Sequence, residues 1–71
     1  MKRYIGSFIA LYDDYDLKMT DVLADNELEA RILVVSAFDA DILSIETPTT
    51  IHDFNEIMDL MDYRVCVMEV R

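Results

Sequence analysis

The chain has 71 residues and a single cysteine, so no disulfide bond within it can hold its fold together. It also lacks the cluster of Cys and His residues that a structural zinc site needs. A domain of this size buries only about 60% of the surface that its unfolded chain exposes. The fold must therefore depend on a dense apolar core or on a partner. Hydrophobic residues make up 54% of the chain, which favours the core and leaves apolar surface for association. We expect one domain over residues 1–71.

The first segment, residues 2–12, is apolar on both sides of an extended strand. One side carries Ile5, Ile9 and Leu11, and the other carries Tyr4, Phe8 and Tyr12. This pattern predicts a strand that is central in its sheet or covered on both faces. The three aspartates in residues 13–16 predict a turn, because Asp side chains can accept hydrogen bonds from nearby backbone N–H groups. Residues 17–24 then read as a strand that returns antiparallel, which makes the first 24 residues a β-hairpin.

A helix is predicted from Asn26 to about Phe38. Asn26 and Glu29 have the spacing of a capping box, in which each side chain accepts a hydrogen bond from the backbone of the other. The short β-branched run at residues 32–35 also suits a strand, but the capping signal favours the helix. The expected apolar face consists of Ala30, Leu33, Val34 and Ala37, widened by Ile32, Val35 and Phe38.

The second half of the chain predicts a short strand at residues 42–46, a second helix and a final strand at residues 64–70. Pro48 ends the short strand, and Thr50 with Asp53 can cap the helix that comes next. The helix has an apolar stripe of Ile51, Phe54, Ile57, Met58 and Met61. The resulting order is β-β-α-β-α-β. We expect an α+β domain with an antiparallel or mixed sheet and both helices packed on one face.

The sequence offers little for catalysis or cofactor binding. Cys66 and His52 could form a thiol–imidazole pair, but Cys66 lies in an apolar strand and is expected to be a small core residue, with His52 on the surface. The aspartates at 13, 14 and 16 lack the glycine and terminal glutamate of a calcium loop, so a solvated turn is favoured over a metal site. Gly6 is the only glycine, which excludes a glycine-rich phosphate loop. We expect a protein that is not an enzyme and that binds no cofactor or metal.

The charge indicates the class of partner. Fifteen acidic residues against six Lys and Arg give a formal net charge of −9. Such a chain is expected to repel nucleic acid and anionic membranes and to favour a protein with a basic surface. No targeting segment and no apolar run of the roughly 20 residues that span a bilayer is recognised. The unpaired cysteine fits a reducing compartment, so we expect a cytoplasmic protein.

The segment from Ala24 to Ala30 resembles a strand-to-helix join that is common in small phage and bacterial proteins. Together with the small size, the acidity and the absence of Trp, it gives the chain a resemblance to small acidic phage proteins that inhibit host proteins, among them anti-restriction, anti-CRISPR and DNA-mimicking proteins. The resemblance implies stoichiometric binding and assigns no residues.

Two acidic surfaces are the candidates for partner binding. The first is the outer side of the second helix, with Glu56, Asp59 and Asp62 beside His52 and Asn55; the second is the hairpin tip, with Asp13, Asp14 and Asp16. The sequence leaves three alternatives open. These residues can be ordinary solvated surface, or the chain can be an antitoxin-like partner. It can also be a structural or accessory subunit that self-associates or completes a larger assembly, through the exposed edges of its first or last strand and through Tyr12, Tyr15 and Tyr63.

Overall fold

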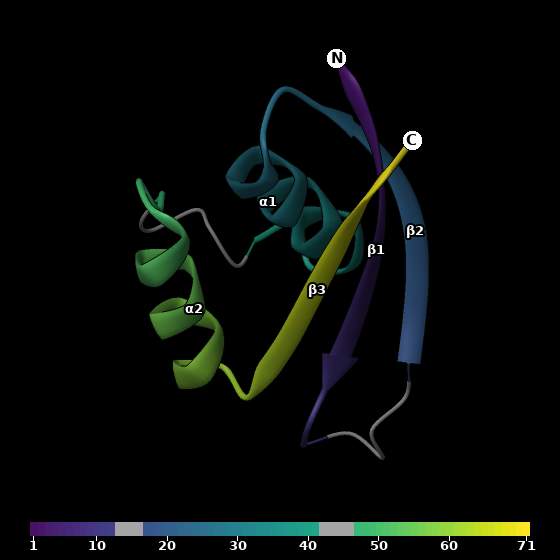
Figure 1. Ribbon diagram of the computed structural model, residues 1–71. Coiled ribbons are helices and arrows are strands. Elements are labelled where there is room, and N and C mark those ends of the chain that lie inside the picture. Colours follow the sequence, from purple (N-terminus) through teal and green to yellow (C-terminus); the bar gives the residue numbers. More distant parts are fainter. Residues whose placement is uncertain (13–16, 42–46) are drawn as a thin grey trace.

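The structure is a computed structural model that describes residues 1–12, 17–41 and 47–71. It contains the strands β1 (Lys2–Ala10), β2 (Leu17–Ala24) and β3 (Tyr63–Val70) and the helices α1 (Glu27–Phe38) and α2 (Ile51–Leu60) (Figure 1). The protein is an α+β domain, as predicted. The strand expected at residues 42–46 lies outside the described residues.

The three strands form one antiparallel sheet in the order β2-β1-β3. Phe8 of β1 lies opposite Lys18 on one side and Val65 on the other, which fixes the register of both pairs. The strand with apolar residues on both sides is therefore the central strand, as predicted. Both helices lie on one face of this sheet (Figure 1): α1 contacts all three strands, whereas α2 contacts β3 and α1.

The core fills the space between the sheet and the helices. Along β1, Tyr4, Gly6 and Phe8 alternate into it. The larger cluster of buried side chains consists of Phe8, Val34, Val35, Phe54, Met58, Tyr63 and Val65, and a smaller one consists of Tyr4, Ala24 and Ala30. Gly6 lies beneath α1, where a Cβ atom would come within 2.2 Å of Val34 Cγ2. The close approach of α1 to β1 therefore requires glycine at this position.

Both helices begin at the capping residues that the sequence predicts. The Asn26 side chain accepts a hydrogen bond of 2.8 Å from the Glu29 N–H, and the Thr50 hydroxyl accepts one of 3.0 Å from the Asp53 N–H. The Glu29 carboxylate reaches back to the Asp25 N–H at 3.3 Å, one residue before the cap. These bonds satisfy backbone donors that have no partner within the helix.

The predicted inner faces of the helices are only partly right. In α1, Val34 and Val35 are buried as predicted, but Leu33 and Ala37 are exposed. The helix is apolar around most of its circumference, so packing decides its rotation. In α2, Phe54 and Met58 are buried, whereas Ile51 and Met61 at the ends of the stripe are 36% and 42% exposed. The ends of this stripe are exposed because β3 is the one strand that α2 contacts.

Candidate binding surfaces

The outer side of α2 is exposed and acidic. The helix is anchored by the buried side chains of Phe54 and Met58. The predicted binding residues His52, Asn55, Glu56 and Asp59 all lie exposed on this helix, and the exposed Asp62 comes just after its end. The structure therefore brings these five predicted residues together on one element and its C-terminal turn. The other candidates, Asp13, Asp14 and Asp16, lie outside the described residues.

Two exposed side-chain pairs lie on this surface, and the one with Arg64 partly neutralises it. The His52 Nε2 atom lies 2.9 Å from Glu56 Oε1, and the Arg64 Nη1 atom lies 3.0 Å from Asp59 Oδ1. All four side chains are at least half exposed. Exposed pairs of this kind contribute about 0–1 kcal/mol and are screened by salt. A competing basic surface can therefore displace them at little cost in free energy.

Asp62 also directs the chain from α2 into β3. Its φ angle of 57° lies in the left-handed region, which Asp tolerates better than most residues. Its N–H group donates to the Asp59 carbonyl at 3.2 Å, and its carbonyl accepts from the Leu11 N–H at 2.8 Å. Asp62 was predicted only as a binding residue, and its part in the turn was missed.

Cys66 and His52 lie on opposite sides of the sheet. Cys66 pairs with Ser7 across β1 and β3, on the face away from the helices, and its side chain is exposed. The expectation that Cys66 is a core residue is therefore wrong, because no described helix covers that face. His52 is on the surface, as predicted. With the sheet between them, the two residues do not form a thiol–imidazole pair.

The face of the sheet away from the helices is the surface that sequence reasoning missed. Four of its side chains are large, apolar and more than half exposed: Leu17, Met19, Leu23 and Met68. Self-association was expected at the strand edges and at Tyr12, Tyr15 and Tyr63 instead. However, β1 is central rather than an edge, Tyr63 is buried, and Tyr15 lies outside the described residues. The apolar pattern on both sides of β1 was the signal for a second apolar face.

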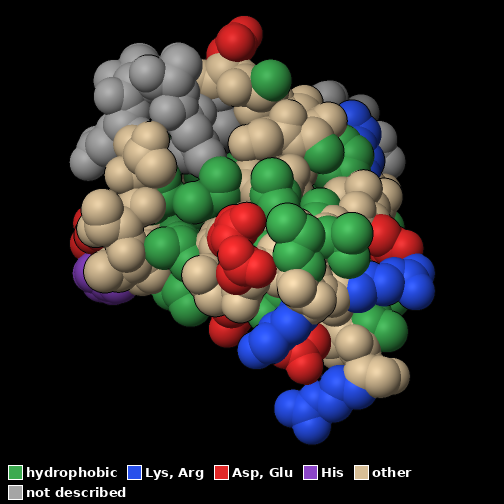
Figure 2. All heavy atoms as spheres, turned by 90° about the horizontal axis from the view of Figure 1, so that it is seen from above, with side chains coloured by type: hydrophobic (Ala, Val, Ile, Leu, Met, Phe, Trp, Pro, Cys, Tyr) green, Lys and Arg blue, Asp and Glu red, His purple; other side chains and the backbone are tan. Residues whose placement is uncertain are grey.

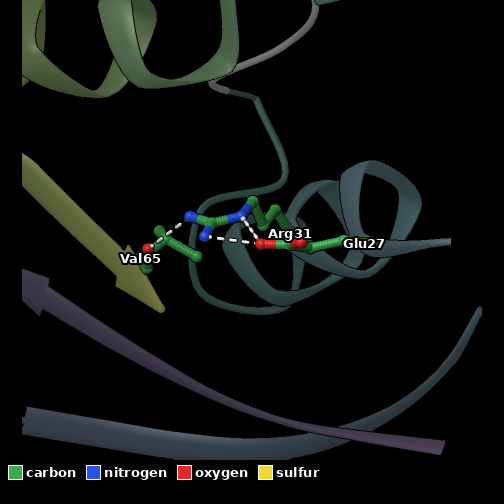
Figure 3. A network of polar contacts seen from close by, with 3 residues as sticks. All are labelled: Glu27, Arg31 and Val65. Carbon is green, nitrogen blue, oxygen red and sulfur yellow. Dashed lines mark hydrogen bonds and ion pairs between the residues drawn. The ribbon is translucent and has the colours of Figure 1, made fainter. Parts of the chain in front are cut away.

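The free edge of β3 is partly covered by Arg31 (Figure 3). The Arg31 guanidinium donates from Nη1 to the Val65 carbonyl at 2.9 Å, and from Nε and Nη2 to Glu27 Oε1 at 3.2 and 2.8 Å. Glu27 lies one turn before Arg31 on α1 and holds the guanidinium in place. This contact satisfies an edge carbonyl and places a charge where another strand would pair.

A second polar contact ties β3 to the end of α1. The Tyr63 hydroxyl donates to Asp39 Oδ2 at 2.9 Å and lies 3.3 Å from the Tyr12 hydroxyl. The hydrogen bond with Tyr12, burial and the Asp39 carboxylate together raise the pKa of Tyr63 far above its ordinary value. Tyr63 therefore stays neutral at physiological pH and acts as a structural donor.

The basic side chains form no free patch among the described residues. Lys2, Arg3, Arg31, Arg64 and Arg71 each form an ion pair with a carboxylate, and Lys18 lies 5.9 Å from the centre of the Phe38 ring. Figure 2 views the end of the molecule that carries both termini. It shows Lys and Arg side chains towards the right and the bottom, hydrophobic side chains around acidic ones at the centre, and the histidine of α2 at the left. The acidic helix and most of the basic side chains seen from this end are thus separated.

Two further features bear on the chemistry of the described residues. No three His, Cys, Asp or Glu side chains among residues 1–12, 17–41 and 47–71 come together in a way that could hold a metal ion. Neither α1 nor α2 is long and apolar enough to cross a membrane.

Comparison of the chain with models of protein families, with curated proteins and with solved structures found no match in any of the three. A function for this protein has to be inferred from the geometry and charge of the chain itself.

Proposed function

We propose that this protein is a non-enzymatic binding domain that acts stoichiometrically, as an inhibitor or regulator, by docking the outer side of α2 onto a basic surface of a larger protein. The observation that carries the proposal is the arrangement of this helix. Phe54 and Met58 fix it on the core, while Glu56 and Asp59 point carboxylates into solvent. A helix held in this way loses less conformational entropy on docking than a loop does.

The charge of the whole chain supports the same partner class. A net charge of −9 attracts a basic surface over a distance of about one Debye length, roughly 8 Å at physiological salt, and raises the association rate. The net charge already counts all six basic residues, so the attraction to a basic surface outweighs the repulsion from these positive charges. The resemblance to phage inhibitors suggests nucleic-acid-binding or host-defence proteins as partners, in the cytoplasm.

The test is capture of partners by the immobilised protein from a lysate of the organism that encodes it, at low and at high salt. The test variant is Glu56→Lys with Asp59→Lys, and the control variant is Asp25→Lys with Asp41→Lys. Both pairs consist of exposed residues, and both change the net charge from −9 to −5. Asp62 is left unchanged, because Lys is disfavoured at its positive φ.

We expect the wild-type protein and the control variant to capture the same basic protein at low salt, and the test variant to lose most of it. Capture should weaken as salt rises, since salt screens the attraction. Equal loss in both variants would mean that net charge matters and α2 does not. Capture that is indifferent to salt and to both variants would contradict the proposal. Circular dichroism of each variant confirms that the fold is retained.

A further inference from the structure

The face of the sheet away from the helices is largely apolar. The register places twelve side chains on it, which are Arg3, Ile5, Ser7 and Ile9 of β1, Leu17, Met19, Asp21 and Leu23 of β2, and Arg64, Cys66, Met68 and Val70 of β3. Leu17, Met19, Leu23 and Met68 are 55–65% exposed. In the part of the chain that the structure describes, both helices lie on the other face and none covers this one (Figure 1). An apolar sheet face of this extent in a small protein marks a surface that another protein covers.

The shape of this sheet face is complementary to itself. Ser7 lies between Met19 of β2 and Cys66 of β3 in one cross-strand row. Because Ser7 and Cys66 are short, a hollow of about 190 Å³ opens above them, flanked by the methionines Met19 and Met68. An apolar cavity of about 150 Å³ accommodates benzene, so this hollow has room for part of a side chain. The same face thus carries both flexible protruding side chains and a hollow that can receive them, which is what a two-fold symmetric interface requires.

The charge on this face also fits a second copy better than a basic partner. Asp21 is the only acidic residue among the twelve, and its carboxylate lies 2.6 Å from the Arg3 guanidinium. Arg64 reaches towards α2, where its guanidinium lies 3.0 Å from the Asp59 carboxylate, so the face carries almost no net charge in a chain whose net charge is −9. A basic protein would be attracted to the acidic α2 instead. Two copies repel each other least when they meet through this face, because both α2 helices then point outwards.

The extent of the face is sufficient for a weak dimer. Three strands about 4.8 Å apart and seven residues long, at about 3.3 Å per residue, give a face of roughly 14 by 23 Å. The pleat and the protruding side chains expose more than this projected area, so two stacked faces bury on the order of 1,000 Å², which is about the lower limit for a specific interface.

We propose that this face is the interface of a symmetric homodimer, in which two copies stack sheet on sheet. The exposed ends of Met19 and Met68 in each copy pack over the hollow of the other, with part of one side chain entering it, and the pair presents one acidic α2 helix on each outer side. The dimer does not depend on the function of α2: the face would associate whether or not the helix binds a basic protein.

The test is analytical ultracentrifugation from low micromolar to millimolar protein. The interface variant is Met19→Thr with Met68→Thr, since threonine is polar and suits strands. The control is Leu60→Gln, which removes an 85% exposed apolar side chain from α2. We expect a monomer–dimer equilibrium in the wild type and the control, and at least tenfold weaker association in the interface variant. A wild type that stays monomeric at all concentrations, or an interface variant that dimerises as the wild type does, would overturn the proposal. A monomeric wild type whose binding to a different protein is lost in the interface variant would also overturn it, because another partner would then occupy the face.

A second measurement needs no variant. Cys66 lines the hollow of the face, so the dimer should shield its thiol. The rate constant for modification by a maleimide should fall several-fold as the protein concentration rises through the dimerisation range. A rate constant that is independent of concentration would contradict the interface. Added salt should strengthen the dimer, because it screens the repulsion between two acidic chains, whereas it should weaken docking of α2 on a basic partner.

Discussion

Gly6→Ala tests how closely α1 approaches the sheet. A Cβ atom at position 6 would lie 2.2 Å from Val34 Cγ2 and 3.1 Å from both Val34 Cβ and Cγ1. Val34 is fully buried in the helix. Its β-branched side chain has one strongly preferred rotamer there. The added methyl group therefore meets a neighbour that cannot rotate away, and α1 must move outwards.

Overpacking of this kind costs typically about 1–3 kcal/mol. Replacing glycine by alanine in a strand returns roughly 0.5–1 kcal/mol, because the unfolded chain loses freedom. We therefore expect a net loss of about 1–2 kcal/mol in the free energy of unfolding. For a domain of this size, this corresponds to a fall in Tm of roughly 4–16 °C.

The assay is urea unfolding followed by circular dichroism, at one fixed protein concentration so that association does not alter the comparison. Ser7→Ala is the matched control, since it lies next to Gly6 but on the opposite face, and it should change stability by less than about 0.5 kcal/mol. In the double variant Gly6→Ala with Val34→Ala, the new methyl group occupies space that Val34 vacates. The losses in the free energy of unfolding measured for the two single variants should then sum to about 1–2 kcal/mol more than the loss measured for the double variant. Strictly additive losses, or an unchanged midpoint for Gly6→Ala, would refute the close approach.

The remaining predictions concern the cap, the edge and the buried tyrosine. Asn26→Ala removes the acceptor for the Glu29 N–H and should lower the free energy of unfolding by about 1 kcal/mol in urea, where an unchanged midpoint would contradict the cap. Arg31→Met keeps an unbranched apolar stem but removes the guanidinium and so frees the Val65 carbonyl at the edge of β3. It should lower stability by about 1 kcal/mol and increase light scattering from aggregates, and scattering equal to that of the wild type would count against a protective role. Because the pKa of Tyr63 is raised in the folded protein, the folded protein keeps a proton that the unfolded chain loses near pH 10. The stability that this difference contributes is complete below about pH 10 and is lost as the pH rises further. Tyr63→Phe should flatten this alkaline loss, and an unchanged pH profile would show that Tyr63 does not cause it.

Local signals in the sequence were sufficient to predict the helices and strands that the structure describes. Asn26 and Thr50 mark the first turns of both helices because capping depends on residues three positions apart. The apolar pattern on both sides of residues 4–9 identified the central strand, because that pattern depends only on alternation along one strand.

The rotation of α1 and the exposure of Cys66 were not predictable in this way. Both depend on which face of a helix or strand packs against another element. The alternation of apolar residues along a strand cannot show whether one or both faces of its sheet are covered. The sequence marked both faces of β1 as apolar, and Cys66 was placed in the core because its strand is apolar too. The two helices cover one face only, so Cys66 and Met68 are exposed. The candidate residues Glu56 and Asp59 were easier to place, because the anchoring stripe of α2 directs them outwards.

The claim that α2 docks on a basic partner can be tested most directly by mapping the surface that the partner covers. Two-dimensional nuclear magnetic resonance spectra of the isotope-labelled protein would be recorded as the captured partner is added. We expect the amide signals of residues 52–62 to shift or broaden first, while those of Ser7, Met19 and Met68 keep the positions that they have in the protein alone. Changes confined to the sheet face, with residues 52–62 unaffected, would contradict the proposed docking surface.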